Sequence, residues 1–250
     1  MILNLRGGLG NQIIQLSYLL NNTNNAFANT NAIKLRDQLK KLNNITYIDS
    51  RLLNYSLGTI RKIISLTFLK TTDIKLPGLR DGYFQYGDIT NIIPIILNKH
   101  LSKQIYFDTQ IDHNIDIVLH IRGGDYFTQS AQKVYEVCNE SYYLNALLLA
   151  EKKIAKNTIN VFIVTNDKKY ASFLLKKILQ NKTYNFQFYY KSEWQDFSLI
   201  YRATIAIIPN STFSLTARML CSEKKTYVPK KWFTERSGLI APYCSNFTYI

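Results

Sequence analysis

The stretch Arg6-Gly7-Gly8-Leu9-Gly10-Asn11-Gln12 stands between an apolar run, Met1–Leu5, and a second run with helical spacing, Ile13–Leu20. This order predicts a strand, a glycine turn and a helix. Glycine permits positive φ angles and close approach of a ligand to the backbone, and the first helical turn has N–H groups without intrahelical partners. The turn is therefore a candidate site for a polar ligand, with an ordinary βα turn as the alternative.

The rest of the first half alternates segments of helical and extended character, which is typical of an α/β fold. Tyr47-Ile48 predicts a short strand, and the polar segment Asn21–Asn31 predicts a loop. Ile60–Leu69 and approximately Ile89–Leu101 predict helices, with an aromatic loop at Asp81–Gly87 before the second of them.

A boundary between two halves is expected near Ser102–Asn114. It divides the chain into an N-terminal domain, residues 1–110, and a C-terminal domain, residues 111–250. The second half repeats the order strand, polar loop, helix. Its expected strands are Ile115–Ile121, Val161–Val164, Phe186–Tyr190 and Ala203–Ile208, and its expected helices are Tyr142–Ala155, Tyr170–Leu179, Asp196–Tyr201 and Leu215–Cys221.

Polar residues lie in or directly after three of these strands. In doubly wound sheets ligands bind outside the carboxyl ends of the strands, so these side chains are expected to converge on one crevice. They are His120, Arg122, Asp125, Asn166, Asp167, Asn210, Ser211 and Thr212.

The first of these loops has the chemistry of an anion site. Arg122 carries a permanent charge with forked donors suited to phosphate or carboxylate, and Gly123-Gly124 lets the backbone close on that ligand. The alternative is an Arg122–Asp125 pair that only ties the loop. His120 lies within the strand, where an imidazole is either part of the core or a catalytic base.

The loops after the second and the last of these three strands each allow a ligand-binding role and a purely structural role. Asn166 or Asp167 could accept hydrogen bonds from the N1–H and amino groups of a guanine, or could cap a helix. Asn210–Ser214 precedes the predicted helix Leu215–Cys221, and its hydroxyl and N–H groups suit either phosphate oxygens or helix capping.

Composition narrows the class of protein. The chain has 250 residues, a net charge of +14 and no apolar run of the roughly 20 residues that span a bilayer. Three widely spaced cysteines without a CxxC pair argue against a disulfide framework and a zinc site. The sequence has no Asp-x-Asp pattern, so no metal is expected. It also has no Walker-type and no Gly-x-Ser-x-Gly pattern, which argues against a P-loop protein and a hydrolase. We expect a cytoplasmic protein.

Taken together, the motifs resemble the α-1,2-fucosyltransferase family, glycosyltransferase family 11. The matching segments, in the family's order, are Gly8-Leu9-Gly10-Asn11-Gln12, Gly82-Tyr83-Phe84-Gln85, His120–Tyr126, Val164–Asp167, Asn210–Ser214 and Pro229–Phe233. They span nearly the whole chain.

This resemblance implies a GT-B fold, in which two Rossmann-like domains face each other across a cleft. The N-terminal domain would lie on the acceptor side and the C-terminal domain would bind the GDP-sugar. The implied reaction is inverting, metal-independent transfer of L-fucose from GDP-β-L-fucose to the 2-hydroxyl of a glycan, commonly at a terminal galactose. With the net charge of +14, which would suit docking to a membrane that carries glycan acceptors, we expect a place in bacterial surface polysaccharide synthesis.

The resemblance also implies residue roles. Arg122 would hold the β-phosphate, and Asn166 or Asp167 would read guanine. Ser211 and Thr212 would bind phosphate. The remaining candidates for substrate binding are Gly8, Gly10, Gln12, His120, Asn210, Phe213 and Ser214.

Transfer also needs a group near the sugar and a base for the acceptor proton. Asn11 would lie near the transferred sugar, and Asp125 is the candidate base. The chain departs from the family pattern at Gly123, which replaces a second arginine, and at Leu215-Thr216, which replaces a Trp-Trp pair. The loss of that arginine predicts weaker donor binding or help from a basic neighbour such as Lys230-Lys231.

Three alternatives remain open from the sequence. One is another GDP-sugar transferase, such as an enzyme resembling protein O-fucosyltransferases. The second is a basic nucleic-acid-binding protein, suggested by the charge of +14, although no recognisable module is present and no nucleic-acid partner is expected. The third is an inactive relative. The same charge would suit peripheral contact with the anionic inner face of the cytoplasmic membrane.

Overall fold

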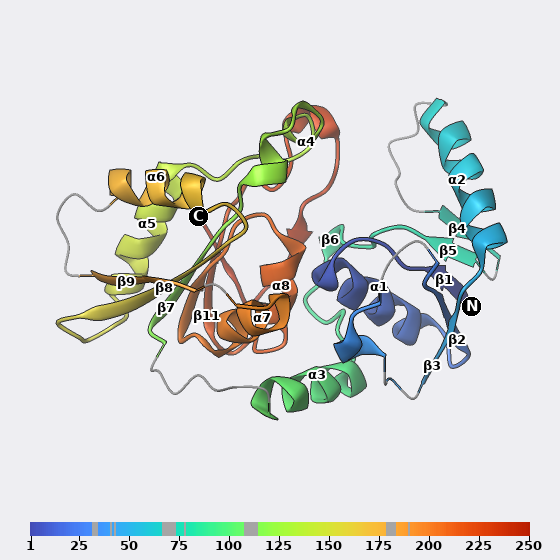
Figure 1. Cartoon of the computed structure of the whole chain (residues 1–250), viewed down its shortest axis with the longest axis horizontal. Helices are drawn as coiled ribbons and strands as arrows, with labels where there is room; N and C mark the ends of the chain where they lie inside the picture. The colour runs from blue at the N-terminus through green and yellow to red at the C-terminus, as the bar shows by residue number, and fades with distance from the viewer. Residues whose placement is uncertain are drawn as a thin grey trace. The chain divides into compact units, whose positions relative to one another are not determined.

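The computed structural model describes residues 1–31, 35–40, 42, 44–66, 74–77, 79–107, 115–178, 184–189 and 191–250 (Figure 1). The chain forms two compact units, Met1–Tyr106 and Phe107–Ile250. Each is built on a sheet in which most or all neighbouring strands are parallel. The predicted α/β class is confirmed. The GT-B arrangement of two domains facing across a cleft stays a prediction.

The N-terminal unit contains a five-stranded sheet in the order β3-β2-β1-β5-β4, in which only the β4–β5 pair is antiparallel. Its strands are β1 (Ile2–Asn4), β2 (Ala26–Asn29), β3 (Ile45–Ile48), β4 (Ile74–Leu76) and β5 (Leu79–Asp81). The other elements are α1 (Leu9–Asn22), η1 (Asp37–Leu39), α2 (Arg51–Leu66), β6 (Gly87–Asp88) and α3 (Ile95–Phe107).

The C-terminal unit contains a six-stranded sheet in the order β13-β11-β10-β7-β8-β9, with every neighbouring pair parallel. Its strands are β7 (Ile117–Ile121), β8 (Ile159–Thr165), β9 (Tyr184–Phe188), β10 (Ile205–Ile207), β11 (Lys225–Val228) and β13 (Thr248–Tyr249). The other elements are η2 (Gly124–Phe127), α4 (Gln129–Gln132), α5 (Glu140–Glu151), α6 (Lys168–Ile178), α7 (Glu193–Arg202), α8 (Thr212–Met219), η3 (Glu235–Ser237) and β12 (Pro242–Tyr243).

Strand β7 organises the C-terminal unit because both of its faces are buried. Ile117, Leu119 and Ile121 pack into the core that includes residues of α5 and α6. His120, on the opposite face, contacts Ser214 of α8. Helices therefore cover both faces of the sheet, as in a doubly wound fold (Figure 1).

Several element boundaries differ from expectation. The sequence predicts a loop at Asn21–Asn31, but this segment contains β2. The prediction fails because Asn29 is fully buried in the sheet. Its side chain tolerates burial because Nδ2 donates a hydrogen bond to Oδ1 of Asn4 at 2.9 Å. Helix α3 begins at Ile95, after Pro94, and not at Ile89, since proline suits the start of a helix.

Other predictions from the sequence fall partly outside the described residues. These are the end of the predicted helix Ile60–Leu69, the last residue of the predicted helix Tyr170–Leu179, the last residue of the predicted strand Phe186–Tyr190, and residues 108–114 of the expected domain boundary. Helix α2 itself begins earlier than expected, at Arg51.

In the described part of the chain, no helix has both the length and the apolar character needed to cross a bilayer. Within the same residues, no group of three or more His, Cys, Asp or Glu side chains is arranged to hold a metal ion. Cys138, Cys221 and Cys244 are buried free thiols.

Candidate active site

The loops at the carboxyl ends of β7 and β8 are joined by hydrogen bonds. The backbone N–H of Gly123 donates to Oδ1 of Asn166 at 2.9 Å, and that of Gly124 donates to Oδ2 of Asp167 at 3.0 Å. Because β7 and β8 are parallel neighbours, their carboxyl ends lie at one edge of the sheet. The structure thus brings together the residues that the sequence places after these two strands.

Asn166 braces the loop after β7. Besides accepting from Gly123, its Nδ2 donates to the carbonyl of Gly123 at 3.1 Å and to Oδ1 of Asp125 at 3.2 Å. Both the oxygen and the nitrogen of the amide therefore face this loop. The contact fixes the backbone that carries Arg122 and Asp125.

Asp167 has the geometry of a helix cap. Its Oδ1 accepts from the backbone N–H of Tyr170 at 3.0 Å in the first turn of α6, and its Oδ2 accepts from Gly124. The capping role that the sequence left open is present. A nucleobase would have to share these carboxylate oxygens.

Arg122 is the cation of this cluster. Its Nη2 donates to Oδ2 of Asp125 at 2.7 Å, and its guanidinium lies 5.3 Å from the ring centroid of Tyr126. The side chain is 29% exposed, and its Nε is buried without a hydrogen-bond partner. Arg122 therefore keeps donor capacity beyond its pair with Asp125, which is 59% exposed.

His120 belongs to the interior. Its Nδ1 lies 2.8 Å from Oγ of Ser214, and its ring meets that of Phe213 in an edge contact. Burial, with a smaller contribution from the charge of Arg122, lowers the pKa of His120 to about 3. The imidazole is therefore neutral at neutral pH, and it supports α8 through Ser214.

We expect His120 to remain neutral from pH 7 down to pH 4 in the folded protein. In the unfolded chain it binds a proton below its ordinary pKa of 6.5, so unfolding takes up a proton between about pH 6.5 and 3. Stability should therefore fall by up to about 1.4 kcal/mol per pH unit as the pH decreases through this window. Imidazole NMR measures the titration directly, and a midpoint near 6.5 would contradict the assignment. A His120→Gln variant should lose this part of the pH dependence of urea unfolding.

The third loop, after β10, is locked to the segment that follows β11. Nδ2 of Asn210 donates to the carbonyls of Trp232, at 2.8 Å, and Glu136, while the carbonyl of Asn210 accepts from the hydroxyl of Tyr126 at 2.7 Å. Asn210 therefore positions the start of α8. Ser211 is the N-cap residue of that helix, although its side chain makes no capping hydrogen bond.

The absence of a side chain at Gly123 has a structural reason. A Cβ at this position would lie 2.9 Å from Cβ of Asp167 and 3.0 Å from Cδ1 of Tyr170. Both distances are shorter than ordinary contacts. The space beside the backbone where the family signature has its second arginine is therefore occupied by Asp167 and Tyr170.

Gly123→Arg should not improve the site. The new side chain would push against Asp167 and Tyr170, so we expect the free energy of unfolding to fall by about 1–3 kcal/mol and donor binding to weaken. Urea unfolding and calorimetric titration with GDP measure the two effects. The double variant Gly123→Arg/Asp167→Gly removes the facing Cβ and should recover part of the stability. Tighter GDP binding by the single variant would be the opposite of this expectation.

In the N-terminal unit, the glycine turn links β1 to α1. Gly7 has a φ of +73°, which favours glycine, and Gly8 is the N-cap residue of α1. Gln12, only 1% exposed, donates from Nε2 to the carbonyl of Gly7 at 3.0 Å and accepts at Oε1 from the N–H of Arg36. Gln12 therefore braces the turn. Asn11 is half-buried in the first turn of the helix.

The aromatic loop packs beside this turn. Gln15, which is not among the predicted site residues, accepts from the N–H of Arg6 and donates to the carbonyl of Gly82 at 2.7 Å. Arg6 also lies over the ring of Tyr83, at 5.8 Å. Two of the motif segments are thus joined within one unit. The only signal for this role in the sequence is the helical spacing of Gln15 from Gln12, three residues earlier.

The doubly wound sheet, with a cation and glycines at the carboxyl end of its central strand, defines an α/β protein equipped to bind an anionic ligand. The sequence profile of "Glycosyl transferase family 11" matches residues 3–250. The chain belongs to glycosyl transferase family 11, the fucosyltransferase family that its motifs resemble.

Solved structures of similar shape include the NodZ α-1,6-fucosyltransferase soaked with GDP-fucose, at 13% identity and a TM-score of 0.49, covering 88% of this chain and 92% of that one. POFUT1 in complex with GDP has 9% identity, a TM-score of 0.48, and coverage of 91% and 97%. NodZ from Bradyrhizobium, in selenomethionine form, has 12% identity, a TM-score of 0.47, and coverage of 88% and 91%. No curated protein matches the sequence of this chain.

Proposed function

We propose that the protein transfers L-fucose from GDP-β-L-fucose to the 2-hydroxyl of a galactose-terminated glycan, with inversion and without a metal. The family match supports fucosyl transfer. The observation that carries the proposal is the Arg122 cluster at the end of β7, where a partly exposed guanidinium is held by a braced loop.

Arg122 would bind the β-phosphate of the donor. A guanidinium there stabilises the negative charge that builds up on the diphosphate as the sugar leaves, which is the role a metal has in other sugar-nucleotide enzymes. Ser211 and Thr212, at the start of α8, would bind phosphate oxygens through hydroxyl or N–H groups. Asp167 is a better candidate than Asn166 for guanine, because a carboxylate oxygen can accept more than one hydrogen bond.

In the proposed reaction, the bond between C1 of fucose and the diphosphate oxygen breaks, and its electron pair leaves with GDP. The acceptor 2-oxygen bonds to C1 from the opposite face, which converts the β-linked donor into an α-linked product. The hydroxyl proton goes to a base, for which we propose Asp125. Asn11 would contact the transferred sugar, with Gly8 and Gly10 allowing its approach.

Asp125 also pairs with Arg122, so its two roles must be separated. Loss of the base predicts a fall in kcat in Asp125→Asn with little change in the KM for GDP-fucose. A variant with unchanged turnover would remove Asp125 from this role. A rise only in the KM for GDP-fucose would leave it as a support for Arg122.

We further propose that the C-terminal unit binds the donor and the N-terminal unit lies on the acceptor side, as in the GT-B arrangement. The proposed location is the cytoplasm, with peripheral contact to the inner membrane face, supported by the charge of +14. Vesicles with anionic lipids at physiological salt test this contact, and an absence of binding would end it.

The decisive experiment measures GDP release from GDP-fucose, with EDTA present, against a panel of galactose-terminated acceptors. Acceptor-dependent release, with an α-1,2-linked product by NMR, is the expected result. Release that requires added metal would contradict metal independence. If no acceptor stimulates GDP release and calorimetry detects no binding of GDP-fucose, the proposed function is overturned.

A further inference from the structure

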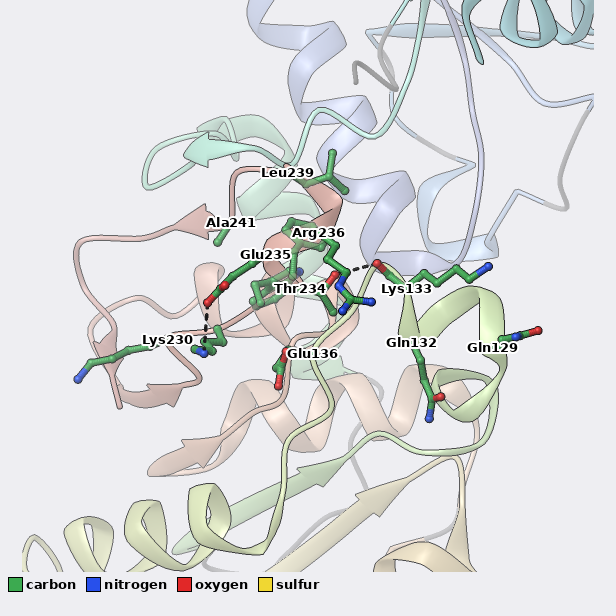
Figure 2. Close-up of a pocket in the computed structure, with 13 residues that line it drawn as sticks. Gln129, Gln132, Lys133, Glu136, Lys230, Thr234, Glu235, Arg236, Leu239 and Ala241 are labelled. Atoms are coloured by element: carbon green, nitrogen blue, oxygen red, sulfur yellow. Dashed lines mark hydrogen bonds and ion pairs between the residues drawn. The ribbon is translucent and has the colours of Figure 1, made fainter. Parts of the chain in front are cut away.

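A pocket of about 940 Å³ lies within the C-terminal unit. Figure 2 shows it between the segment 129–136, which follows the Arg122 loop, and the segment 230–241, which follows β11. None of the residues proposed for donor binding or catalysis lines it, although Asn210 donates hydrogen bonds to the carbonyls of Glu136 and Trp232 in its wall. Its volume is that of a pocket for a small molecule or a short saccharide.

The pocket is connected to the Arg122 loop by aromatic rings. The guanidinium of Arg122 lies over Tyr126, which stacks on Tyr135 with ring centroids 4.9 Å apart. Tyr135 in turn contacts Phe233, at 5.6 Å, and Phe233 lines the pocket. These successive ring contacts place the wall of the pocket near the loop where the reacting end of a bound saccharide would lie.

The two walls are held together by backbone hydrogen bonds. The N–H of Thr234 donates to the carbonyl of Val134 at 2.9 Å, and that of Glu136 donates to the carbonyl of Trp232 at 3.3 Å. The hydroxyl of Thr234 adds a bond to the carbonyl of Lys133 at 2.7 Å. The pocket is therefore preformed, which reduces the ordering that ligand binding requires.

Positive charge exceeds negative charge around the pocket. The charged residues that line it are Lys133, Glu136, Lys230, Lys231, Glu235 and Arg236. Lys231 pairs with Glu235 at 3.7 Å. Across the described part of the chain, neither Lys133 nor Arg236 forms an ion pair. In Figure 2, Arg236 lies in the middle of the labelled group, whereas Lys230 extends away from it.

We infer that this pocket binds an anionic substituent, a carboxylate or a phosphate, on the sugar next to the galactose of the acceptor. Lys133 and Arg236, on opposite walls, are the two cations that recognise it. The inference rests on the proposed function, because it assigns the pocket to the acceptor. It adds a contact on the C-terminal unit to the acceptor side proposed for the N-terminal unit. It gives the acceptor a chemical class, an acidic glycan.

Matched disaccharides test the charge alone. Lactobionate and lactitol present the same terminal galactose on an open chain that ends in a carboxylate or a hydroxymethyl group, and α-lactose 1-phosphate and lactose form the phosphate pair. With two exposed cations, we expect a KM about fivefold lower for the anionic member of at least one pair. Comparing the two pairs tells carboxylate from phosphate.

The variant Lys133→Gln/Arg236→Gln should abolish this preference while leaving the KM for GDP-fucose unchanged. Lys176→Gln, which removes one charge from the exposed face of α6, is the control and should keep the preference. Equal KM values in the wild-type enzyme for both pairs would overturn the inference and leave fucosyl transfer intact. A rise in the KM for GDP-fucose in the double variant would show instead that the pocket binds the donor.

Saturation-transfer NMR of the same sugars, without GDP-fucose, gives a readout that does not need turnover. Stronger saturation transfer to lactobionate or lactose 1-phosphate than to its neutral counterpart, lost in the double variant, supports the pocket even if neither disaccharide is fucosylated. An equal signal for all four sugars contradicts it. Saturation transfer therefore tests the anion-binding pocket, and GDP release tests fucosyl transfer, so one hypothesis can fail while the other stands.

Discussion

Replacing Arg122 by alanine is expected to lower kcat/KM for GDP-fucose by about 10²–10³-fold, the effect of removing a donor that stabilises charge in the transition state. The variant loses the only side-chain cation that the loop after β7 carries at this strand end. It also leaves Asp125 without its partner at 2.7 Å, so the local charge becomes more negative where the diphosphate would bind. GDP release at several donor concentrations separates the loss of kcat from the rise in KM.

Two controls make this result specific. Arg122→Lys keeps the charge but loses the forked donor geometry, so it should recover only part of the activity. Lys176→Gln should retain full activity, because it changes the net charge without touching the site. Activity of Arg122→Ala within threefold of the wild type would refute the role of Arg122, provided that its thermal unfolding is unchanged.

Replacing Arg218 by methionine should destabilise the C-terminal unit by about 3 kcal/mol or more, since several buried acceptors lose their donor at once. Arg218 is completely buried in α8. Its Nη1 donates to the carbonyls of Ile200 and Ala203 at 2.9 Å, its Nη2 to that of Lys225 at 3.0 Å, and its Nε to the hydroxyl of Thr226 at 2.9 Å. It thereby ties the end of α7 to β11.

Thermal unfolding followed by circular dichroism measures this effect, and a shift of the unfolding midpoint of roughly 6–12 °C is expected for a loss of this size. Lys176→Met, an exposed change of the same kind, should shift the midpoint by no more than about 1 °C, since surface substitutions cost little. A midpoint for Arg218→Met that equals the control would show that water replaces the lost donors.

The sequence was sufficient for the elements whose burial is uniform. β7 and β8 consist mostly of buried apolar residues because both faces of a doubly wound sheet are covered, and such runs are recognisable without a structure. The convergence of the loops after Ile121 and Thr165 followed from the same topology. The hydrogen bonds between Gly123, Gly124, Asn166 and Asp167 bear out that placement.

The sequence was insufficient where a residue's environment depends on distant parts of the chain. From the sequence, Arg218 is expected to be an exposed basic residue of a helix. It can be buried only because carbonyl groups of other segments accept its hydrogen bonds. The reason for Gly123 depends on Asp167 and Tyr170, which a single sequence does not place. β2 was missed because its buried Asn29 is satisfied by another asparagine.

The position of β7 at the centre of its sheet has a consequence for synthesis of the chain. Its partners are β8 on one side and β10 on the other, and β10 begins on the order of 80 residues after β7 ends. At ribosomal rates of about 5–20 residues per second, one edge of β7 stays unpaired for roughly 4–17 s. The run Ile117-Val118-Leu119-His120-Ile121 is apolar and rich in β-branched residues, so during this interval it can pair with the same segment of another nascent chain. The strand that later holds the Arg122 loop is thus a place where newly made chains are exposed to aggregation.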